Sequence, residues 1–400
     1  MTVNIFVVAL MVLALASQDT LASVRDLRGY GSAKHVVLIG LDGLDVRCLH
    51  QALANGSAPH LEYLRNHGVY TDKARNNRPA VSLPNWASIL YGAGVMFHGV
   101  TSNGWTYCTH DEDDVNYTPP YLDECVVYPD LFTVAKQQQP DFTTALFYEW
   151  VNFDSILPNE TVAIDTRRFI DSSDCGGTTN ASILLTDEAL TLITATAMPQ
   201  LLVLHYDEAD ACATESSCFA DIGQFAIAAA DANIGRLLDA VASAGLANST
   251  VFVVVSDHGR NEDGTHHGGK AKSNFETQWV VYGQDIIEGS RELKSAISIE
   301  DTAPTVAHFL GFDAPLEWHG RVVREVLLQA NESLYSAAKS PWGTCLNADC
   351  GNRKLGLPDV QKVVEVNWTM GIVSTCVVVG GLCLAMFVRF YSYRRGYEEV

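Results

Sequence analysis

The sequence is poor in basic residues and contains neither internal repeats nor low-complexity tracts. Its 400 residues include 26 Lys and Arg against 47 Asp and Glu, which gives a formal net charge of −21. This charge repels nucleic acid phosphates, so we expect no nucleic acid partner. The lack of a period of about 20–50 residues excludes solenoids and propellers. With 48% hydrophobic residues, the chain can bury the core of one large domain or two modest ones.

Basic residues are also missing before the first apolar segment, residues 5–16, but small residues follow it, and the segment predicts a signal peptide over residues 1–23. Near the other end, residues 369–388 carry no charge and would form about 30 Å of helix, enough to cross a bilayer. The basic residues that follow directly are Arg389, Arg394 and Arg395. They favour a transmembrane helix over the alternative, a buried core helix, and leave a cytoplasmic tail at 389–400. We therefore expect a single-pass type I protein of the plasma membrane or an endomembrane, with an extracellular or lumenal ectodomain.

Cysteines and glycosylation signals agree with such an ectodomain. Eight of the ten cysteines lie between the two apolar segments, and their spacing suggests disulfides rather than a zinc knuckle. The local pairs would be Cys108–Cys125, Cys212–Cys218 and Cys345–Cys350, which leaves Cys48 for Cys175, although spacing alone does not fix the connectivity. N-x-Ser/Thr sequons begin at Asn55, Asn116, Asn159, Asn180, Asn248, Asn331 and Asn367.

Strand and helix patterns alternate along the ectodomain. Short aliphatic runs predict buried strands at 35–40, 144–147, 200–205 and 250–256. Helical patterns lie between them, notably at 59–67 and 220–244. This order predicts a largely parallel sheet with helices on both faces, in which ligands bind at the carboxyl ends of the strands. The polar residues at such ends are Asp42, Asp210, Asp257 and His258.

These polar residues are the types that a metal-assisted hydrolase needs. Carboxylates and imidazoles bind Zn²⁺, and a metal-bound hydroxyl becomes a nucleophile. Ser82 is the natural hydroxyl, and Asn85 could donate to a phosphoryl oxygen. Taken alone, Ser82-Leu83-Pro84-Asn85 would read as a helix-entry turn.

The motifs together resemble the alkaline phosphatase superfamily, and most closely its nucleotide pyrophosphatase/phosphodiesterase (type I phosphodiesterase) group. The resemblance runs from about residue 34 to 327 and rests on Ile39-Gly40-Leu41-Asp42-Gly43, Ser82-Leu83-Pro84-Asn85-Trp86, Gly92, His98-Gly99-Val100, Asn103-Gly104-Trp105, Asp257-His258-Gly259, His267-Gly268-Gly269 and Asp301-Thr302-Ala303-Pro304-Thr305. It implies a three-layer α/β sandwich as a catalytic ectodomain over residues 30–330, followed by a juxtamembrane stalk at 331–368.

The resemblance also implies two zinc ions beside Ser82. The first would be bound by Asp42, Ser82, Asp257 and His258. The second would be bound by Asp210, a histidine four residues later and His267, but Thr214 stands where that histidine is expected, and no other histidine lies between His205 and His258. Fewer ligands would weaken zinc binding.

Thr214 leaves three possibilities open. Thr214 or Glu215 could complete a changed second site, the enzyme could work with one metal, or catalysis could have lapsed and left a surface binding protein. His266 is a further possible ligand, but adjacent residues of an extended chain point to opposite sides, which disfavours His266 and His267 on one metal.

Other enzyme classes fit less well. A sulfatase would need arginine where Trp86 stands, a serine esterase would need a Gly-x-Ser-x-Gly elbow around Ser82, and a glycosidase would not explain the histidines. A phosphomonoesterase stays an alternative, with Arg260 or Lys270 as the only candidates for the arginine-type clamp of a dianionic substrate.

Several polar residues near these motifs have simpler explanations. Asp45 would cap the next helix, Asp207 and Glu208 would lie beside the site or at the surface, and His98 would pack as structure. We therefore expect a membrane-anchored ecto-hydrolase of phosphoester bonds. It would be a zinc-dependent phosphodiesterase or pyrophosphatase that acts through phospho-Ser82 on a small phosphoester, such as a nucleotide or a phospholipid head group.

Overall fold

The computed structural model of the chain describes residues 31–106, 128–159, 162–171, 175, 181–195 and 198–328. Among these residues, no helix is both long and apolar enough to cross a bilayer. The predicted signal peptide at 1–23, stalk at 331–368, transmembrane helix at 369–388 and tail at 389–400 lie outside the described residues and stay predictions.

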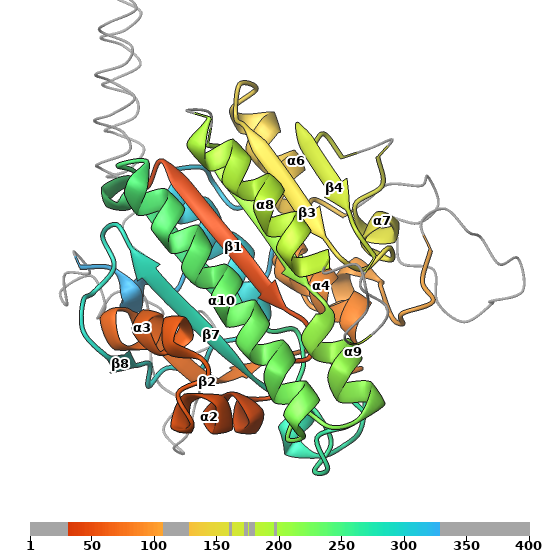
Figure 1. Cartoon of the computed structure of the whole chain (residues 1–400). Helices are drawn as coiled ribbons and strands as arrows, with labels where there is room; N and C mark the ends of the chain where they lie inside the picture. The colour runs from red at the N-terminus through yellow and green to blue at the C-terminus, as the bar shows by residue number, and fades with distance from the viewer. Residues whose placement is uncertain are drawn as a thin grey trace, which may run out of the picture. The chain divides into compact units, whose positions relative to one another are not determined.

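In the described part of the chain, an eight-stranded sheet has the order β4-β3-β5-β1-β6-β7-β2-β8 (Figure 1). The strands are β1 (His35–Leu41), β2 (Val69–Arg75), β3 (Thr144–Tyr148), β4 (Thr166–Phe169), β5 (Leu201–Tyr206), β6 (Thr250–Val255), β7 (Glu276–Gly283) and β8 (Arg291–Glu292). From β4 to β6 every neighbouring pair is parallel. β7 runs antiparallel to both β6 and β2, and β8 is parallel to β2.

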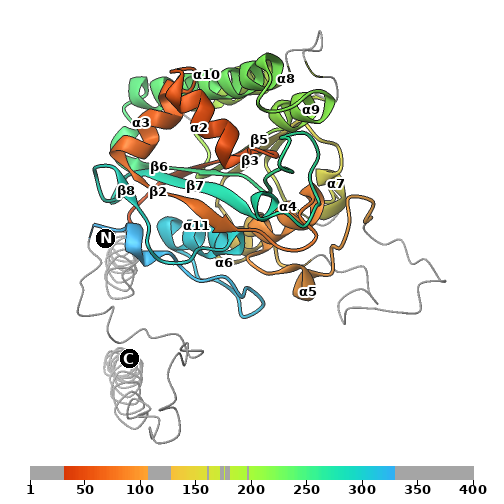
Figure 2. The same cartoon turned by 90° about the horizontal axis from the view of Figure 1, so that it is seen from below.

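Helices cover both faces of this sheet and make three layers (Figure 2). One face carries α2 (Val46–Ala54), α3 (Pro59–His67), α8 (Ala181–Thr194), α9 (Glu208–Glu215) and α10 (Asp221–Ser243). The other carries α4 (Ser82–Tyr91), α6 (Leu131–Gln138) and α11 (Thr302–Leu310). The shorter helices are α5 (Val95–His98) and α7 (Phe153–Ile156), with 3₁₀ turns at η2 (Ala247–Ser249), η3 (Lys272–Asn274), η4 (Ile299–Asp301) and η5 (Arg324–Val326).

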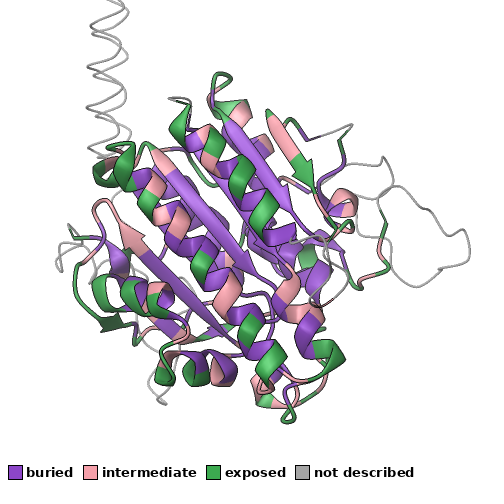
Figure 3. Cartoon of the chain, viewed as in Figure 1, coloured by how far each residue is buried: buried purple, intermediate pink, exposed green. Residues whose placement is uncertain are grey.

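The central strands are apolar on both sides because each side faces a helical layer. In β1, Val36 and Leu38 belong to one core, whereas Val37, Ile39 and Leu41 belong to the other. Successive side chains of a strand point to opposite faces, so an unbroken aliphatic run is what a doubly covered strand requires. Figure 3 shows these strands as buried and the outer sides of the helices as exposed.

The predicted three-layer α/β fold of the ectodomain is confirmed: the sheet is mostly parallel and lies between two helical layers. The predicted strands at 35–40, 144–147, 200–205 and 250–256 correspond to β1, β3, β5 and β6. The predicted helix at 59–67 is α3, and the one at 220–244 is α10, one residue shorter at each end. The antiparallel strand β7 is an addition that the sequence analysis did not anticipate.

Two of the suggested cysteine pairs are wrong. Cys48 is bonded to Cys218, and Cys175 to Cys212, in place of Cys212–Cys218 and Cys48–Cys175. Cys212 lies within α9, whereas Cys218 lies beyond the end of that helix, next to α2. Nearness in sequence therefore did not bring these two thiols together. The other suggested pairs, Cys108–Cys125 and Cys345–Cys350, lie outside the described residues.

Candidate active site at the carboxyl edge of the sheet

Three neighbouring strands end at the same place. β1 lies between β5 and β6 and is parallel to both, so the carboxyl ends of all three meet at one edge of the sheet. Asp42 directly follows β1, His205 is near the end of β5, and Asp257 and His258 lie just beyond β6. None of these four residues is more than 1% exposed. The strand topology thus collects buried carboxylates and imidazoles from distant parts of the sequence.

Ser82 also belongs to this group, and it comes from the helical layer that contains α4, α6 and α11. It is the first residue of α4, and its side chain is buried. The Ser82 Oγ lies 3.1 Å from His258 Nε2 and donates a hydrogen bond to Asp42 Oδ1 at 3.4 Å. The predicted nucleophile therefore faces the predicted ligands.

Asn85 holds the turn that precedes Ser82. Its Nδ2 donates to the carbonyl oxygens of Pro79 and Val81 at 3.0 Å and 2.8 Å, and its Oδ1 accepts from the backbone N–H of Asn77 at 2.8 Å. Both amide N–H groups are thus engaged by backbone oxygens. A contact between Asn85 and substrate stays a prediction.

Asp42 is fixed by two ring N–H donors. Its Oδ2 accepts from Trp86 Nε1 at 2.8 Å and from His205 Nε2 at 3.1 Å. Burial opposes ionisation of Asp42, but the hydrogen bond from His205 holds its pKa below the usual range. The Trp86 ring reaches this position because Gly40 has no side chain, since a Cβ there would overlap the ring.

His258 presents an unprotonated nitrogen to the site. Its Nδ1 is 3.1 Å from the carbonyl oxygen of Gly259, which can only accept, so Nδ1 carries the proton and Nε2 the lone pair. Burial, together with the charge of His267, lowers the pKa of His258 well below its ordinary value. A neutral imidazole oriented by a backbone carbonyl is the arrangement in which histidine binds metals.

Asp257 contributes a carboxylate oxygen that lacks a protein partner. Its Oδ1 accepts from the Gly43 N–H at 3.0 Å, whereas its Oδ2 is buried with no hydrogen-bond partner among the described residues. Burial raises the pKa of Asp257 well above its usual value, and the neighbouring charge of Asp42 raises it further. Two buried carboxylates side by side favour a cation between them.

The spacing of these four side chains fits one tetrahedral metal ion. His258 Nε2 is 3.5 Å from Asp42 Oδ1, 3.4 Å from Asp257 Oδ2 and 3.1 Å from Ser82 Oγ. Ligand atoms about 2.0–2.1 Å from a tetrahedral zinc ion are about 3.3 Å apart. The residues predicted for the first zinc site are therefore suited in chemistry and in separation to hold one.

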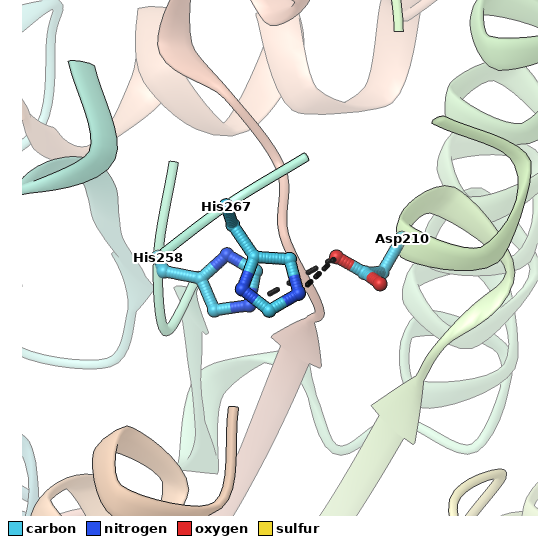
Figure 4. A group of neighbouring side chains, drawn as sticks. All are labelled: Asp210, His258 and His267. Carbon is cyan, nitrogen blue, oxygen red and sulfur yellow. Dashed lines mark ion pairs between the residues drawn. The ribbon is translucent and has the colours of Figure 1, made fainter. Parts of the chain in front are cut away.

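A second group lies beside the first (Figure 4). Asp210 projects from α9 toward the stacked rings of His258 and His267, whose centroids are 3.9 Å apart. Asp210 Oδ1 is 3.9 Å from His258 Nε2 and 4.0 Å from His267 Nε2. The structure thus brings Asp210 and His267 together, as the sequence analysis expected.

Of the additional ligands suggested for this second group, only Thr214 contacts it. Glu215 and His266 are exposed, and neither belongs to a metal-type cluster of the described residues. Thr214 donates to Asp210 Oδ2 at 3.4 Å and accepts from Arg260 Nη1 at 3.3 Å. Arg260 in turn forms an ion pair with Asp210 Oδ1.

Asp207 and His205 form a third acidic-imidazole group with Asp42. Sequence reasoning placed Asp207 and Glu208 beside the site or at the surface, and gave His205 no role. The backbone N–H of Asp207 donates to Glu149 Oε2 at 2.7 Å, and Glu208 accepts from a serine hydroxyl of α8. Burial and the charge of Asp42 raise the pKa of Asp207. A histidine ending a buried aliphatic strand was the available signal for His205.

Asp45 and His98 have the structural roles that were expected. Asp45 is the N-cap of α2 and accepts from the Arg47 N–H at 2.8 Å. His98 is buried, its Nε2 is 2.9 Å from Ser88 Oγ, and its Nδ1 accepts from the Val100 N–H at 3.1 Å. Neither side chain is needed to complete the groups described above.

Comparison with known proteins agrees with this geometry. The sequence profile of the type I phosphodiesterase / nucleotide pyrophosphatase family matches residues 36–278, a segment that contains every residue of the groups above. The chain belongs to this family. A search of curated protein sequences finds no match.

Solved structures show the same fold at low sequence identity. Murine ectonucleotide pyrophosphatase/phosphodiesterase 5, an inactive form in complex with AMP, is 13% identical with a TM-score of 0.56, over 74% of this chain and 100% of that one. The phosphonate monoester hydrolase of Silicibacter pomeroyi is 18% identical, with a TM-score of 0.53 over 74% and 76%. A protein of Bacteroides thetaiotaomicron described as a putative sulfatase is 12% identical, with a TM-score of 0.58 over 74% of this chain and 74% of that one.

As a member of the type I phosphodiesterase family, this chain is a phosphoester hydrolase of the alkaline phosphatase superfamily. In this family member, Asp/His groups that could bind metal lie where the strands end. Trp86 had no predicted role in the site, and Arg260 was only a candidate for a substrate clamp. Both lie at the same edge of the sheet as these groups.

Proposed function

We propose that the protein is a membrane-anchored ecto-hydrolase that cleaves phosphodiesters or pyrophosphates with the help of zinc and through a phospho-Ser82 intermediate. The observation that carries the proposal is the position of Ser82 Oγ, 3.1 Å from His258 Nε2 and 3.4 Å from Asp42 Oδ1. A hydroxyl in this position lies beside side chains that could bind a metal ion, and a bound metal ion can activate a weak nucleophile.

The chemistry divides between the bound ion and the side chains. A zinc ion held by Asp42, Ser82, Asp257 and His258 would lower the pKa of the serine hydroxyl and stabilise charge on the phosphoryl oxygens. The Ser82 hydroxyl gives its proton to water and its oxygen attacks phosphorus, and one ester oxygen leaves as an alcohol after taking a proton from water. Ser82 then carries a phosphoryl group that still bears the second ester group. Water attacks this phosphorus, the Ser82 oxygen leaves and takes up a proton, and a phosphomonoester is released. Burial of Asp42 and His258 keeps competing solvent from this face.

Arg260 favours a diester over a dianionic monoester. A monoester dianion is best recognised by a guanidinium with free N–H groups. The Arg260 side chain donates to Gly43 O, Asp210, Thr214 and Thr265 O, so its N–H groups are already engaged by protein acceptors. Of the two candidates for a clamp, only the exposed Lys270 remains. The substrate class we propose is a small phosphodiester, such as a nucleotide derivative or a phospholipid head group.

An oxidising compartment is supported by features on the described surface. Asn55, Asn159 and Asn248, which begin sequons, are exposed and accessible to glycosylation. Among the described residues, two disulfides join cysteines from separate segments of the chain, and three of these four cysteines are buried. With the apolar segments at 5–16 and 369–388, these features support an extracellular or lumenal ectodomain on a single-pass anchor.

The test is hydrolysis by full-length protein purified in detergent and supplied with Zn²⁺. We expect turnover of a bis-nitrophenyl phosphodiester to exceed that of the nitrophenyl monoester. Ser82→Ala should lower kcat by about 10³-fold or more, because the nucleophile is lost. Ser290→Ala, the same change at an exposed serine, should leave the rate unchanged. Acid quenching during turnover of the diester should trap a nitrophenyl-phosphoryl group on Ser82. Full activity of Ser82→Ala would disprove the proposed intermediate.

Thr214 favours a second candidate, a binding protein that has lost catalysis. Its hydroxyl replaces the imidazole that the family resemblance implies, and it contacts Arg260 instead. Protein that holds zinc at the first site, binds a diester and turns over neither ester would support this second candidate against the first.

A further inference from the structure

The group around Asp210 has too few donors for a second zinc ion. Asp210 and His267 supply one ligand atom each, and His258 Nε2 is already part of the first group. Thr214 provides only a neutral hydroxyl, and a zinc site of two protein ligands falls short of the three or four that zinc sites in proteins use. The residues present at the second position therefore do not fit the metal that the family resemblance implies.

A guanidinium fills this position instead. Arg260 lies two residues beyond His258 and is 0% exposed. Its Nε donates to Gly43 O at 3.0 Å, and its Nη2 donates to Asp210 O at 2.9 Å and to Asp210 Oδ1. Its Nη1 donates to Thr214 Oγ1 at 3.3 Å and to Thr265 O. All five guanidinium N–H groups thus have acceptors, which come from three segments of the chain.

The absence of a side chain at Gly43 makes room for the pair of Asp210 and Arg260. Gly43 has a φ of 58°, and a Cβ there would lie 2.7 Å from Arg260 Nη2 and would overlap Asp210 Oδ1. A buried guanidinium also needs a paired carboxylate to offset its desolvation, and Asp210 provides it. Asp210 Oδ1, the same oxygen that faces His258 and His267, is therefore engaged by a fixed positive charge.

We propose that the Arg260 guanidinium takes the place of the second metal ion, so that the protein binds a single divalent ion at Asp42, Ser82, Asp257 and His258. This inference rests on the proposed function for the identity of that first site. Thr214 then completes the arrangement, because its hydroxyl accepts from Arg260 and donates to Asp210. Because its N–H groups are all engaged, Arg260 acts through its charge rather than through direct hydrogen bonds to substrate.

The experiment measures metal content rather than turnover. Full-length protein is stripped with chelator, loaded with Zn²⁺, desalted and analysed for zinc per chain, and calorimetric titration with Zn²⁺ gives an independent count. We expect one zinc for the wild type. Asp210→Asn should still bind one, because Asp210 pairs with Arg260 and not with metal. The matched control Asp257→Asn should bind less than about one tenth as tightly, because it loses a ligand.

A gain-of-site series tests the role of the guanidinium directly. Thr214→His alone should remain at one zinc, because Arg260 still occupies Asp210. Thr214→His combined with Arg260→Gln should bind two, because the added imidazole and the vacated carboxylate complete three ligands with His267. If the double variant fails to fold, as judged by circular dichroism, the wild-type count and the Asp210→Asn comparison still decide the matter.

The outcomes separate this inference from the proposed function. Two zinc ions in the wild type, one of them lost in Asp210→Asn, would overturn the inference and leave the hydrolase proposal standing. One zinc that depends on Asp257, without turnover of any ester, would support the inference while the hydrolase proposal fails. A count of zero, or one zinc that is indifferent to Asp257→Asn, would overturn both.

Discussion

At the scale of single residues, the site depends on side chains that do not bind metal but fix those that would. Trp86 and His205 both donate to Asp42 Oδ2, which leaves Asp42 Oδ1 facing Ser82 and His258. Partners of this kind set the orientation and basicity of a ligand, and their loss typically costs about 10–100-fold in metal affinity.

Trp86→Phe tests this orientation. It keeps most of the ring volume but removes the indole N–H, so Asp42 loses a donor that favours its ionised form. We expect zinc affinity to fall by about 10-fold, measured by competition with a chromogenic chelator. Trp318→Phe is the matched control, because it removes an indole hydrogen bond to the Pro129 carbonyl away from the site. Equal losses in both variants would indicate a general effect on packing rather than on Asp42.

At the scale of the elements, a side chain of one helix caps the N-terminus of another helix. α3 begins at Pro59, and Ala58 before it supplies no side-chain acceptor. Asp231 of α10 provides the missing cap: its Oδ1 accepts from the Leu61 N–H at 2.7 Å and its Oδ2 from the His60 N–H at 3.1 Å. The two helices therefore stabilise each other on the face of the sheet that also carries α9.

Asp231→Ala should destabilise the fold by about 2 kcal/mol, near the upper end for a lost helix cap, because it leaves N–H groups at the start of α3 without acceptors. Urea unfolding followed by tryptophan fluorescence measures the change. Asp239→Ala, at an exposed position on the same helix, should change stability by less than about 0.5 kcal/mol. A cost for Asp231→Ala as small as that of Asp239→Ala would contradict the capping role.

The elements also show how far sequence reasoning extends. Unbroken aliphatic runs ending in polar residues identify β1, β5 and β6, and with them Asp42, Asp257 and His258, because burial and strand ends leave local marks in the sequence. The pairing of Arg260 with Asp210 leaves no such local mark in the sequence. The Arg260 side chain meets Asp210 only because the segment after β6 passes α9, and that path depends on the whole sheet.

Cysteine pairing is hidden from the sequence for a related reason. Cys212 and Cys218 are six positions apart, yet one lies inside α9 and the other beyond its end, so their partners come from distant segments. The antiparallel course of β7 was likewise missed, because strand direction is set by the connection and the neighbouring strands rather than by the composition of the strand itself.

At the scale of the whole molecule, the two disulfides of the described residues close loops of different size. Cys48–Cys218 spans 170 residues, and Cys175–Cys212 spans 37. In the chain-entropy description, a cross-link stabilises a protein by restricting the unfolded state, and more so for a longer loop.

Replacing each cysteine pair by alanine therefore predicts an order of stability. We expect Cys48→Ala/Cys218→Ala to lower the free energy of unfolding by about 1 kcal/mol more than Cys175→Ala/Cys212→Ala does. The two double variants serve as controls for each other, since each loses two cysteine sulfur atoms and the bond between them. Urea unfolding under identical conditions gives the comparison, and the reverse order would show that native-state packing outweighs loop closure.

The central position of β1 has a consequence for synthesis of the chain. Both of its neighbours, β5 and β6, come later in the sequence, and His205 and Asp257 come with them. During synthesis, both edges of β1 therefore stay unpaired until more than 150 further residues have been made. The 163-residue separation of Asp42 and His205 indicates this length. Unpaired strand edges can form hydrogen bonds with strands of other chains, which leads to aggregation. We thus expect nascent chains cut short before β6 to need chaperones, and metal uptake to follow the pairing of β6 with β1.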